Sequence, residues 1–160
     1  MRPQRFQEFA VEALLKAPDV TAAEPWQEGR PYGLHVTFSS GAQLWAAITA
    51  AALSDDYDQP EVPVTDVPPA EVPLPDLYDD GKITPARAEQ YLAAVLTNSG
   101  NAEISKVYTY TTGERAAEPN AHPGVGLMFH SNSRIFMLIQ HTARPGQDKG
   151  GQAFELQGSF

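Results

Sequence analysis

The stretch FSSGAQLWAAI at residues 38–48 has a near-double in FHSNSRIFMLI at residues 129–139. Each stretch places a Ser-containing turn between two strand-like runs, which is the pattern of a β-hairpin. Aligning the two stretches sets Gly41 on Asn132, and these are the residue types that most readily adopt a positive φ angle in a turn. The sequence therefore predicts two hairpins of the same design, and the fold has to accommodate both.

The predicted register places the positive-φ residue in the middle of a three-residue loop, at residues 40–42 and 131–133. In the first hairpin this register pairs Phe38 with Leu44. The equivalent pairs in the second hairpin are also apolar, so one face of each hairpin is expected to face the core.

A helix is expected before each predicted group of strands. Apolar residues recur at three- and four-residue spacings over residues 5–16, which predicts an amphipathic helix. Thr84 and Pro85 are typical of the N-cap and first position of a second helix, which Gly100 would end. The pattern also predicts strands at residues 20–23 and 104–112 and a short edge strand at residues 153–156.

An acidic, proline-rich linker at residues 54–83 separates the two groups of elements. It holds nine of the twenty acidic residues, one of the eleven basic residues and six of the prolines. Proline at this density removes backbone donors and blocks helix formation, so an extended, polyproline-type conformation is expected. The sequence does not decide whether this linker is free or lies along the domain surface.

These elements together predict an α+β domain over residues 1–160. It would comprise a first αβββ half (residues 1–53), the linker (residues 54–83) and a second αβββ half with a C-terminal tail (residues 84–160). Helices on an antiparallel sheet would form two layers, and the likeness of the halves suggests an internal duplication. The order is similar to that of small two-layer folds in chaperone-like and adaptor proteins, which is an analogy of fold only.

Composition excludes several functions. The chain has no cysteine, which removes disulfides and thiolate chemistry. Its longest apolar run, residues 44–53, is about half of the roughly 20 residues that cross a bilayer, and its start does not resemble a secretory signal. Outside the linker the charges nearly balance and form no basic stripe, so nucleic-acid binding is not expected. From the short apolar run and the chain start, no membrane association and a cytoplasmic location are expected. The Ala- and Pro-rich composition resembles that of bacterial or phage chains.

Four histidines are the candidate acid–base groups near neutral pH. His122, His130 and His141 would form an acid–base or metal site only if a loop, a hairpin tip and a strand end converged. The alternative is that each is an ordinary surface histidine. His35 is expected on the outer face of the first hairpin.

The segment at residues 76–87 partly fits a calcium-binding loop. Asp76 and Asp80 stand at the first and fifth positions of such a loop and are its candidate ligands. However, Tyr78 and Arg87 stand where the third and twelfth ligands belong. The alternative is an acidic turn that precedes the second helix and complements its dipole.

The outer face of the second hairpin is the candidate interface. Met128, Phe136 and Leu138 lie there, with Trp45 at the corresponding place in the first hairpin. An exposed patch of this kind is unusual on a monomer, so it is expected to be covered by the linker, by the C-terminal tail or, through self-association or partner binding, by another protein. The alternative is that a second-layer helix covers it. With no complete catalytic motif and no cofactor implied, the sequence favours a non-enzymatic protein-binding, adaptor or assembly module, for which a homodimer is one expected form. The alternatives are a small enzyme with a His/Asp acid–base or metal site between the halves, and a structural component of a phage or mobile-element particle.

Overall fold

The protein has an α+β fold, as the sequence predicts. The computed structural model describes residues 1–52, 55–113 and 121–160. Its elements are α1 (Pro3–Leu15), β1 (Val20–Pro25), β2 (Gly33–Phe38), β3 (Gln43–Ala51), α2 (Pro85–Thr97), β4 (Ile104–Thr109), β5 (Gly124–Phe129) and β6 (Arg134–Ala143). No helix of the described part of the chain is long and apolar enough to cross a membrane.

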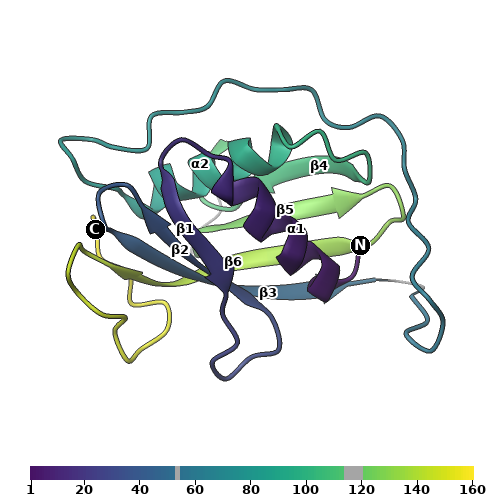
Figure 1. Cartoon of the computed structure of the whole chain (residues 1–160), viewed down its shortest axis with the longest axis horizontal. Helices are drawn as coiled ribbons and strands as arrows, with labels where there is room; N and C mark the ends of the chain where they lie inside the picture. The colour runs from purple at the N-terminus through teal and green to yellow at the C-terminus, as the bar shows by residue number, and fades with distance from the viewer. Residues whose placement is uncertain (53–54, 114–120) are drawn as a thin grey trace.

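The six strands form one continuous antiparallel sheet in the order β1-β2-β3-β6-β5-β4 (Figure 1). The strands of the first half lie on one side, those of the second half lie on the other, and β3 pairs with β6 at the centre. The sequence left open whether the halves share a sheet, and this central pair joins them.

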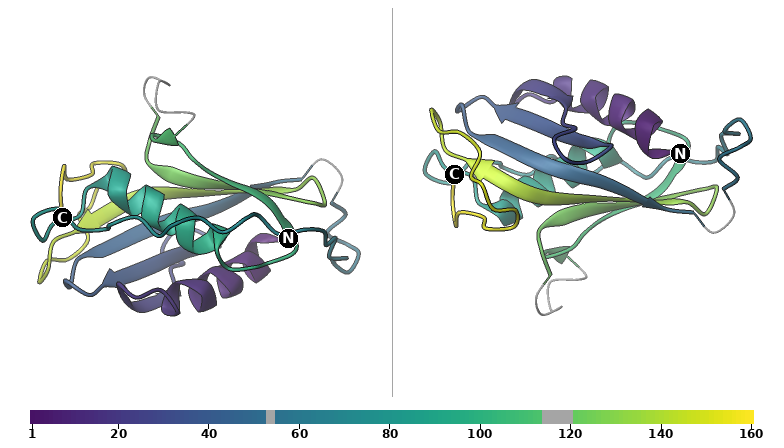
Figure 2. Two further views of the ribbon diagram at one scale, coloured as in Figure 1. Left: turned by 90° about the horizontal axis from the view of Figure 1, so that it is seen from above. Right: turned by 90° about the horizontal axis from the view of Figure 1, so that it is seen from below.

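Both helices cover the same face of the sheet (Figure 2). Helix α1 packs against β1, β2 and β3, and α2 packs against β4 and β5, while the two helices also contact each other. Between the helices and the sheet lies a core that includes Phe6, Leu14, Leu34, Leu44, Tyr91, Leu92, Leu127 and Ile139. The opposite face, which we call the outer face, carries neither helix.

The predicted hairpin register is wrong by two residues in both hairpins. The structure pairs Val36 with Leu44 and Leu127 with Ile135. The positive-φ residues, Gly41 at 89° and Asn132 at 64°, are the last of each three-residue loop and not the middle one. A type I turn followed by a residue with positive φ is the common geometry for this loop length. Because side chains alternate with period two, the shift of two leaves every side chain on its predicted face.

Helix α2 begins as its sequence predicts and is tied to β4 by a buried carboxylate. The Thr84 hydroxyl accepts a hydrogen bond from the Arg87 backbone N–H at 3.2 Å. Glu89, which is fully buried, accepts hydrogen bonds from the backbone N–H groups of Tyr110 and Thr111. These bonds fix the end of β4 against α2, because a buried carboxylate is stable only when its oxygens have donors.

The C-terminal segment crosses the outer face and then enters the core. The strand predicted at residues 153–156 is wrong: these residues form an irregular loop, in which Phe154 has a φ of 68° that a strand does not allow. At the end of the chain Phe160 is buried beside Phe38, and its backbone exchanges two hydrogen bonds with Ile83. This pairing holds the C-terminal residue to Ile83, which lies just before α2.

Candidate protein-binding surface

Alternation along β5 and β6 decides which side chains reach the outer face. Val125 and Leu127 on β5 and Met137 on β6 point into the core under the helices. Met128 on β5 and Phe136 and Leu138 on β6 therefore point the other way, and all three are half-buried. The structure thus brings these three predicted interface residues together on adjacent strands.

Tyr108 of β4 and Tyr110, which directly follows β4, extend this group toward the sheet edge. Tyr108 is paired with Gly126 and lies over it, and Tyr110 lies over Gly124 in the same way. The two rings are 5.7 Å apart at 72°, an edge-to-face contact. We call Tyr108, Tyr110, Met128, Phe136 and Leu138 the outer patch. Sequence reasoning missed the tyrosines, although their alternation opposite two alternating glycines was the available signal.

The basic residues Lys106 and Arg134 border one end of the outer patch. Met128 is paired with Lys106 on one side and with Arg134 on the other, so the three form a row across β4, β5 and β6. Both basic side chains are exposed. A concavity of about 450 Å³ runs along β4 from this row, and its lining comprises Ala93, Lys106, Val107, Tyr108, Thr109, Gly113, Met128 and Arg134. The aromatic surface therefore has a basic border.

Trp45 lies on the outer face but in a covered region next to the outer patch. Its ring stacks on His35 with centroids 4.5 Å apart at 7°, and its exposed fraction is only 7%. The His35 ring nitrogens lie 2.8 Å from Glu24 and 2.8 Å from Gln43, which fixes the orientation of the ring. Trp45 is thus fixed beside the outer patch but is largely buried and adds little exposed surface to it.

The C-terminal segment and the loop after β1 cover this region. Trp26 packs with Trp45 and Ala143 in a small second core, and the Arg30 guanidinium stacks on the Trp26 ring at 3.6 Å. Lys149 approaches the same ring at 6.0 Å. The C-terminal segment, which the sequence named as one possible cover, therefore shields one end of the outer face and leaves the outer patch at the other.

Of the three candidate acid–base histidines, His130 lies apart from His141. His130 is in the β5–β6 turn, 3.0 Å from the Val67 carbonyl, and His122 contacts the ring of Phe154. His141 lies far along β6: the stretch from Arg134 to His141 spans roughly 23 Å at about 3.3 Å per residue. The fold therefore does not bring His130 together with His141.

His141 packs against Trp26, with ring centroids 5.6 Å apart. Burial of the ring, together with the nearby positive charges of Lys149 and Arg30, lowers the pKa of His141. Both effects favour the uncharged form of the imidazole. Among residues 1–52, 55–113 and 121–160, no three His, Asp or Glu side chains are grouped so that they could hold a metal ion.

Of the two predicted calcium ligands, Asp80 lies within a tight turn and Asp76 precedes that turn. Asp80 and Gly81 have φ angles of 49° and 72°, and Asp79 pairs with Lys82 across them. The Arg87 guanidinium donates to the Asp76 backbone carbonyl at 2.9 Å and lies 3.6 Å from the Asp79 carboxylate. This cation thus partly neutralises the acidic turn that precedes α2.

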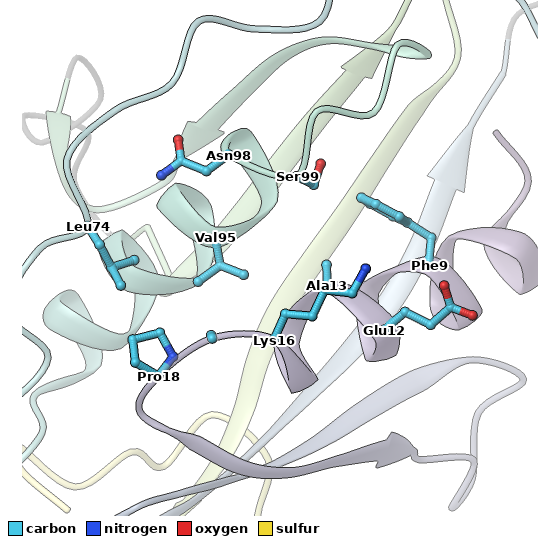
Figure 3. A pocket seen from close by; sticks show the side chains of 10 residues that line it. Phe9, Glu12, Ala13, Lys16, Pro18, Leu74, Val95, Asn98 and Ser99 are labelled. Carbon is cyan, nitrogen blue, oxygen red and sulfur yellow. The ribbon is translucent and has the colours of Figure 1, made fainter.

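A second concavity, which the sequence did not predict, lies between the two helices on the other side of the molecule (Figure 3). Its volume is about 300 Å³, and its lining comprises Phe9, Glu12, Ala13, Lys16, Ala17, Pro18, Leu74, Val95, Asn98 and Ser99. Glu12 and Lys16 place opposite charges at its rim, so the charge of this groove favours neither an anion nor a cation. The outer patch is the more distinctive surface because the two charged residues described at its border, Lys106 and Arg134, are both basic.

Comparison with known proteins gives no relative from which a role could be transferred: no family model, no curated protein and no solved structure matches this chain. The function therefore has to be inferred from the residues and geometry of the surface itself.

Proposed function

We propose that the protein is a non-enzymatic protein-binding or assembly module and that the outer patch is its binding surface. One observation carries the proposal: both helices pack on one face of the sheet, and the other face keeps half-exposed aromatic and apolar side chains. Clustered apolar side chains that stay in contact with water are typical of surfaces that a partner covers.

The residue types of the outer patch support the same conclusion. Aromatic residues, methionine and arginine are enriched in protein interfaces, and hot spots are most often Trp, Tyr or Arg. The outer patch combines Tyr108, Phe136 and Met128 with Arg134 at its border. Its rings are also held in place, since Tyr108 packs over Gly126, and a rigid surface loses little conformational entropy on binding.

The arrangement of the chain supports two further parts of the proposal. We infer that the two αβββ halves arose by internal duplication and act as a single domain, with residues 54–83 as their linker. The meeting of the halves at β3 and β6 supports this, because it builds one wide sheet from two similar units. The enzyme alternative has less support, because β6 separates His130 from His141.

The first test is the effect of Phe136→Ser with Leu138→Ser on the solution mass, measured by light scattering at a low and a high protein concentration. We expect the wild-type mass to rise with concentration and the variant to remain at the protomer mass. Leu15→Ser is the matched control, because Leu15 is an exposed apolar residue of α1 on the helix side of the sheet. It should behave as wild type.

Two results would contradict the proposal of self-assembly. One is a wild type that stays at the protomer mass at both concentrations, and the other is a variant that associates as the wild type does. Circular dichroism of the variant is needed beside the mass, since loss of the fold would also change association. Phe136 and Leu138 are half-buried, so the fold is expected to tolerate the substitutions.

A further inference from the structure

The linker carries most of the exposed large apolar side chains in the part of the chain that the structure describes. Six of the eight exposed large apolar side chains in the described residues belong to it: Tyr57, Val62, Val64, Val67, Val72 and Leu74. Val62 is 78% exposed and Val67 is 75% exposed. Valine has no polar group that favours contact with water, so these side chains form an unusual surface for a segment that otherwise consists of prolines and acids.

The linker is nevertheless held in one conformation along the helix side of the molecule (Figure 1). The Asn98 side chain forms two hydrogen bonds with the Val72 backbone, at 2.8 and 2.7 Å. The Asp66 backbone N–H donates to the Ala102 carbonyl at 2.9 Å, and Arg5 binds Glu61 with two hydrogen bonds. An extended segment that is already ordered loses little conformational entropy when a partner binds it.

The linker and the outer patch are complementary in chemistry. Extended, proline-rich segments bind surfaces lined with aromatic side chains. The outer patch offers Tyr108, Tyr110 and Phe136, and the linker offers prolines alternating with valines. Their charges also match, since the linker has nine acidic residues and one basic residue, and the outer patch is bordered by Lys106 and Arg134.

Building on the proposed function, we infer that the outer patch binds the linker of a second copy of this chain. A linker cannot reach the outer patch of its own copy while Asn98 and Ala102 hold it on the helix side, which is the opposite side of the sheet. The contact therefore joins two different surfaces, linker to outer patch, in a head-to-tail manner. Such contacts produce rings or growing chains, and not only dimers.

A mixing experiment tests this arrangement directly. Phe136→Ser with Leu138→Ser removes the outer patch and keeps the linker, while Val62→Ser with Val67→Ser changes only exposed linker side chains and keeps the outer patch. Each double variant alone should remain at the protomer mass in light scattering. Mixed in equal amounts, they should form a complex of twice the protomer mass and grow no further, because only one complementary pair of surfaces remains.

A labelled peptide of residues 59–76 gives the second measurement, by fluorescence anisotropy with the intact protein. We expect saturable binding that weakens at high salt, is at least about tenfold weaker with Phe136→Ser, and is unchanged with Leu15→Ser. Arg134→Glu should also weaken it. A peptide in which Val62, Val64 and Val67 are replaced by Ser should not bind.

The outcomes separate this inference from the proposed function. If Phe136→Ser with Leu138→Ser abolishes self-association but the peptide does not bind and the mixture stays at the protomer mass, the inference about the linker is wrong and the binding surface stands. If neither the outer-patch variant nor the linker variant changes the mass of an associating wild type, both are wrong. Peptide binding that Phe136→Ser leaves intact would also overturn the inference, because the linker would then bind elsewhere.

Discussion

At the scale of single residues, glycine and tyrosine form the outer patch together. Gly126 and Gly124 have no side chains, and the rings of Tyr108 and Tyr110 occupy that space. A glycine weakens a strand because its backbone loses more conformational entropy on folding and because it has no side chain to pack. An aromatic ring from the neighbouring strand that packs over the glycine offsets this loss. The packing of both rings in the outer patch therefore depends on two residues that have no side chain.

We predict that Gly126→Ala destabilises the protein by about 1 to 3 kcal/mol, as is usual for overpacked sites. A Cβ at this position would lie 2.2 Å from Cζ and 2.5 Å from Oη of Tyr108, so the ring would have to leave its place. Urea unfolding followed by circular dichroism measures the effect. Gly158→Ala is the matched control, because nothing lies within 4 Å of a Cβ there.

A double variant separates the collision with the Tyr108 ring from any other effect of Gly126→Ala. Gly126→Ala made in a Tyr108→Ala background should cost less than in the wild type, because the colliding ring is absent. A Gly126→Ala variant as stable as Gly158→Ala would contradict the packing explanation.

At the scale of elements, the first turn of α2 connects the linker to the second half. Three links meet there: the Thr84 cap, the backbone pairing of Ile83 with Phe160, and the contacts of Arg87 with the acidic turn before it. The sequence predicted the cap from Thr-Pro alone, because a β-region residue with a hydroxyl before a proline is a local signal. It did not predict the pairing with Phe160, which joins distant parts of the chain.

We predict that Thr84→Ala lowers the free energy of unfolding by about 1 kcal/mol, because it removes the acceptor for the Arg87 N–H. Thermal and urea unfolding measure this loss. Thr65→Ala, at an exposed linker position, should leave stability unchanged. If Thr84→Ser keeps most of the stability while Thr84→Ala does not, the hydroxyl is the cause; equal losses in both would argue against a capping role.

At the scale of the whole molecule, an ionic network ties the linker to both halves. Arg5 of α1 binds Glu61 of the linker and Glu103 next to β4, with N–O distances between 2.6 and 3.0 Å. Hydrogen bonds from Arg5 lower the pKa of Glu61 from 4.5 to about 2, against a smaller opposing effect of burial. The folded state therefore favours the ionised form of Glu61 more strongly than the unfolded chain does.

This shift predicts a particular dependence of stability on pH. Because the pKa is lower in the folded state, the contribution of Glu61 is complete above about pH 4.5 and is lost as the pH falls toward 2. Glu61→Gln should lower stability by about 1 kcal/mol at neutral pH and give a flatter pH profile over that window. Urea unfolding of the wild type and the variant at a series of pH values between about 2 and 7 measures both effects. Glu71→Gln is the control, since Glu71 is an exposed linker acid, and profiles that run parallel for both variants would refute the role of Glu61.

The sequence by itself determined the α+β class, both helices with the cap at Thr84, and the faces of the hairpin residues. These follow from local causes: the residue spacing, the turn residues Gly41 and Asn132, and alternation with period two. The same local rules left the hairpin register two residues out, because they do not say where in the loop the positive-φ residue falls.

Only the tertiary structure decided how the halves meet, which face stays open and what covers Trp45. The pairing of β3 with β6, the placing of both helices on one face, and the path of the C-terminal segment across Trp26 are contacts between residues far apart in the chain. Such contacts depend on the total buried surface and not on any local pattern. Met128, Phe136 and Leu138 were visible in the sequence, but Tyr108 and Tyr110 joined them only when β4 paired with β5.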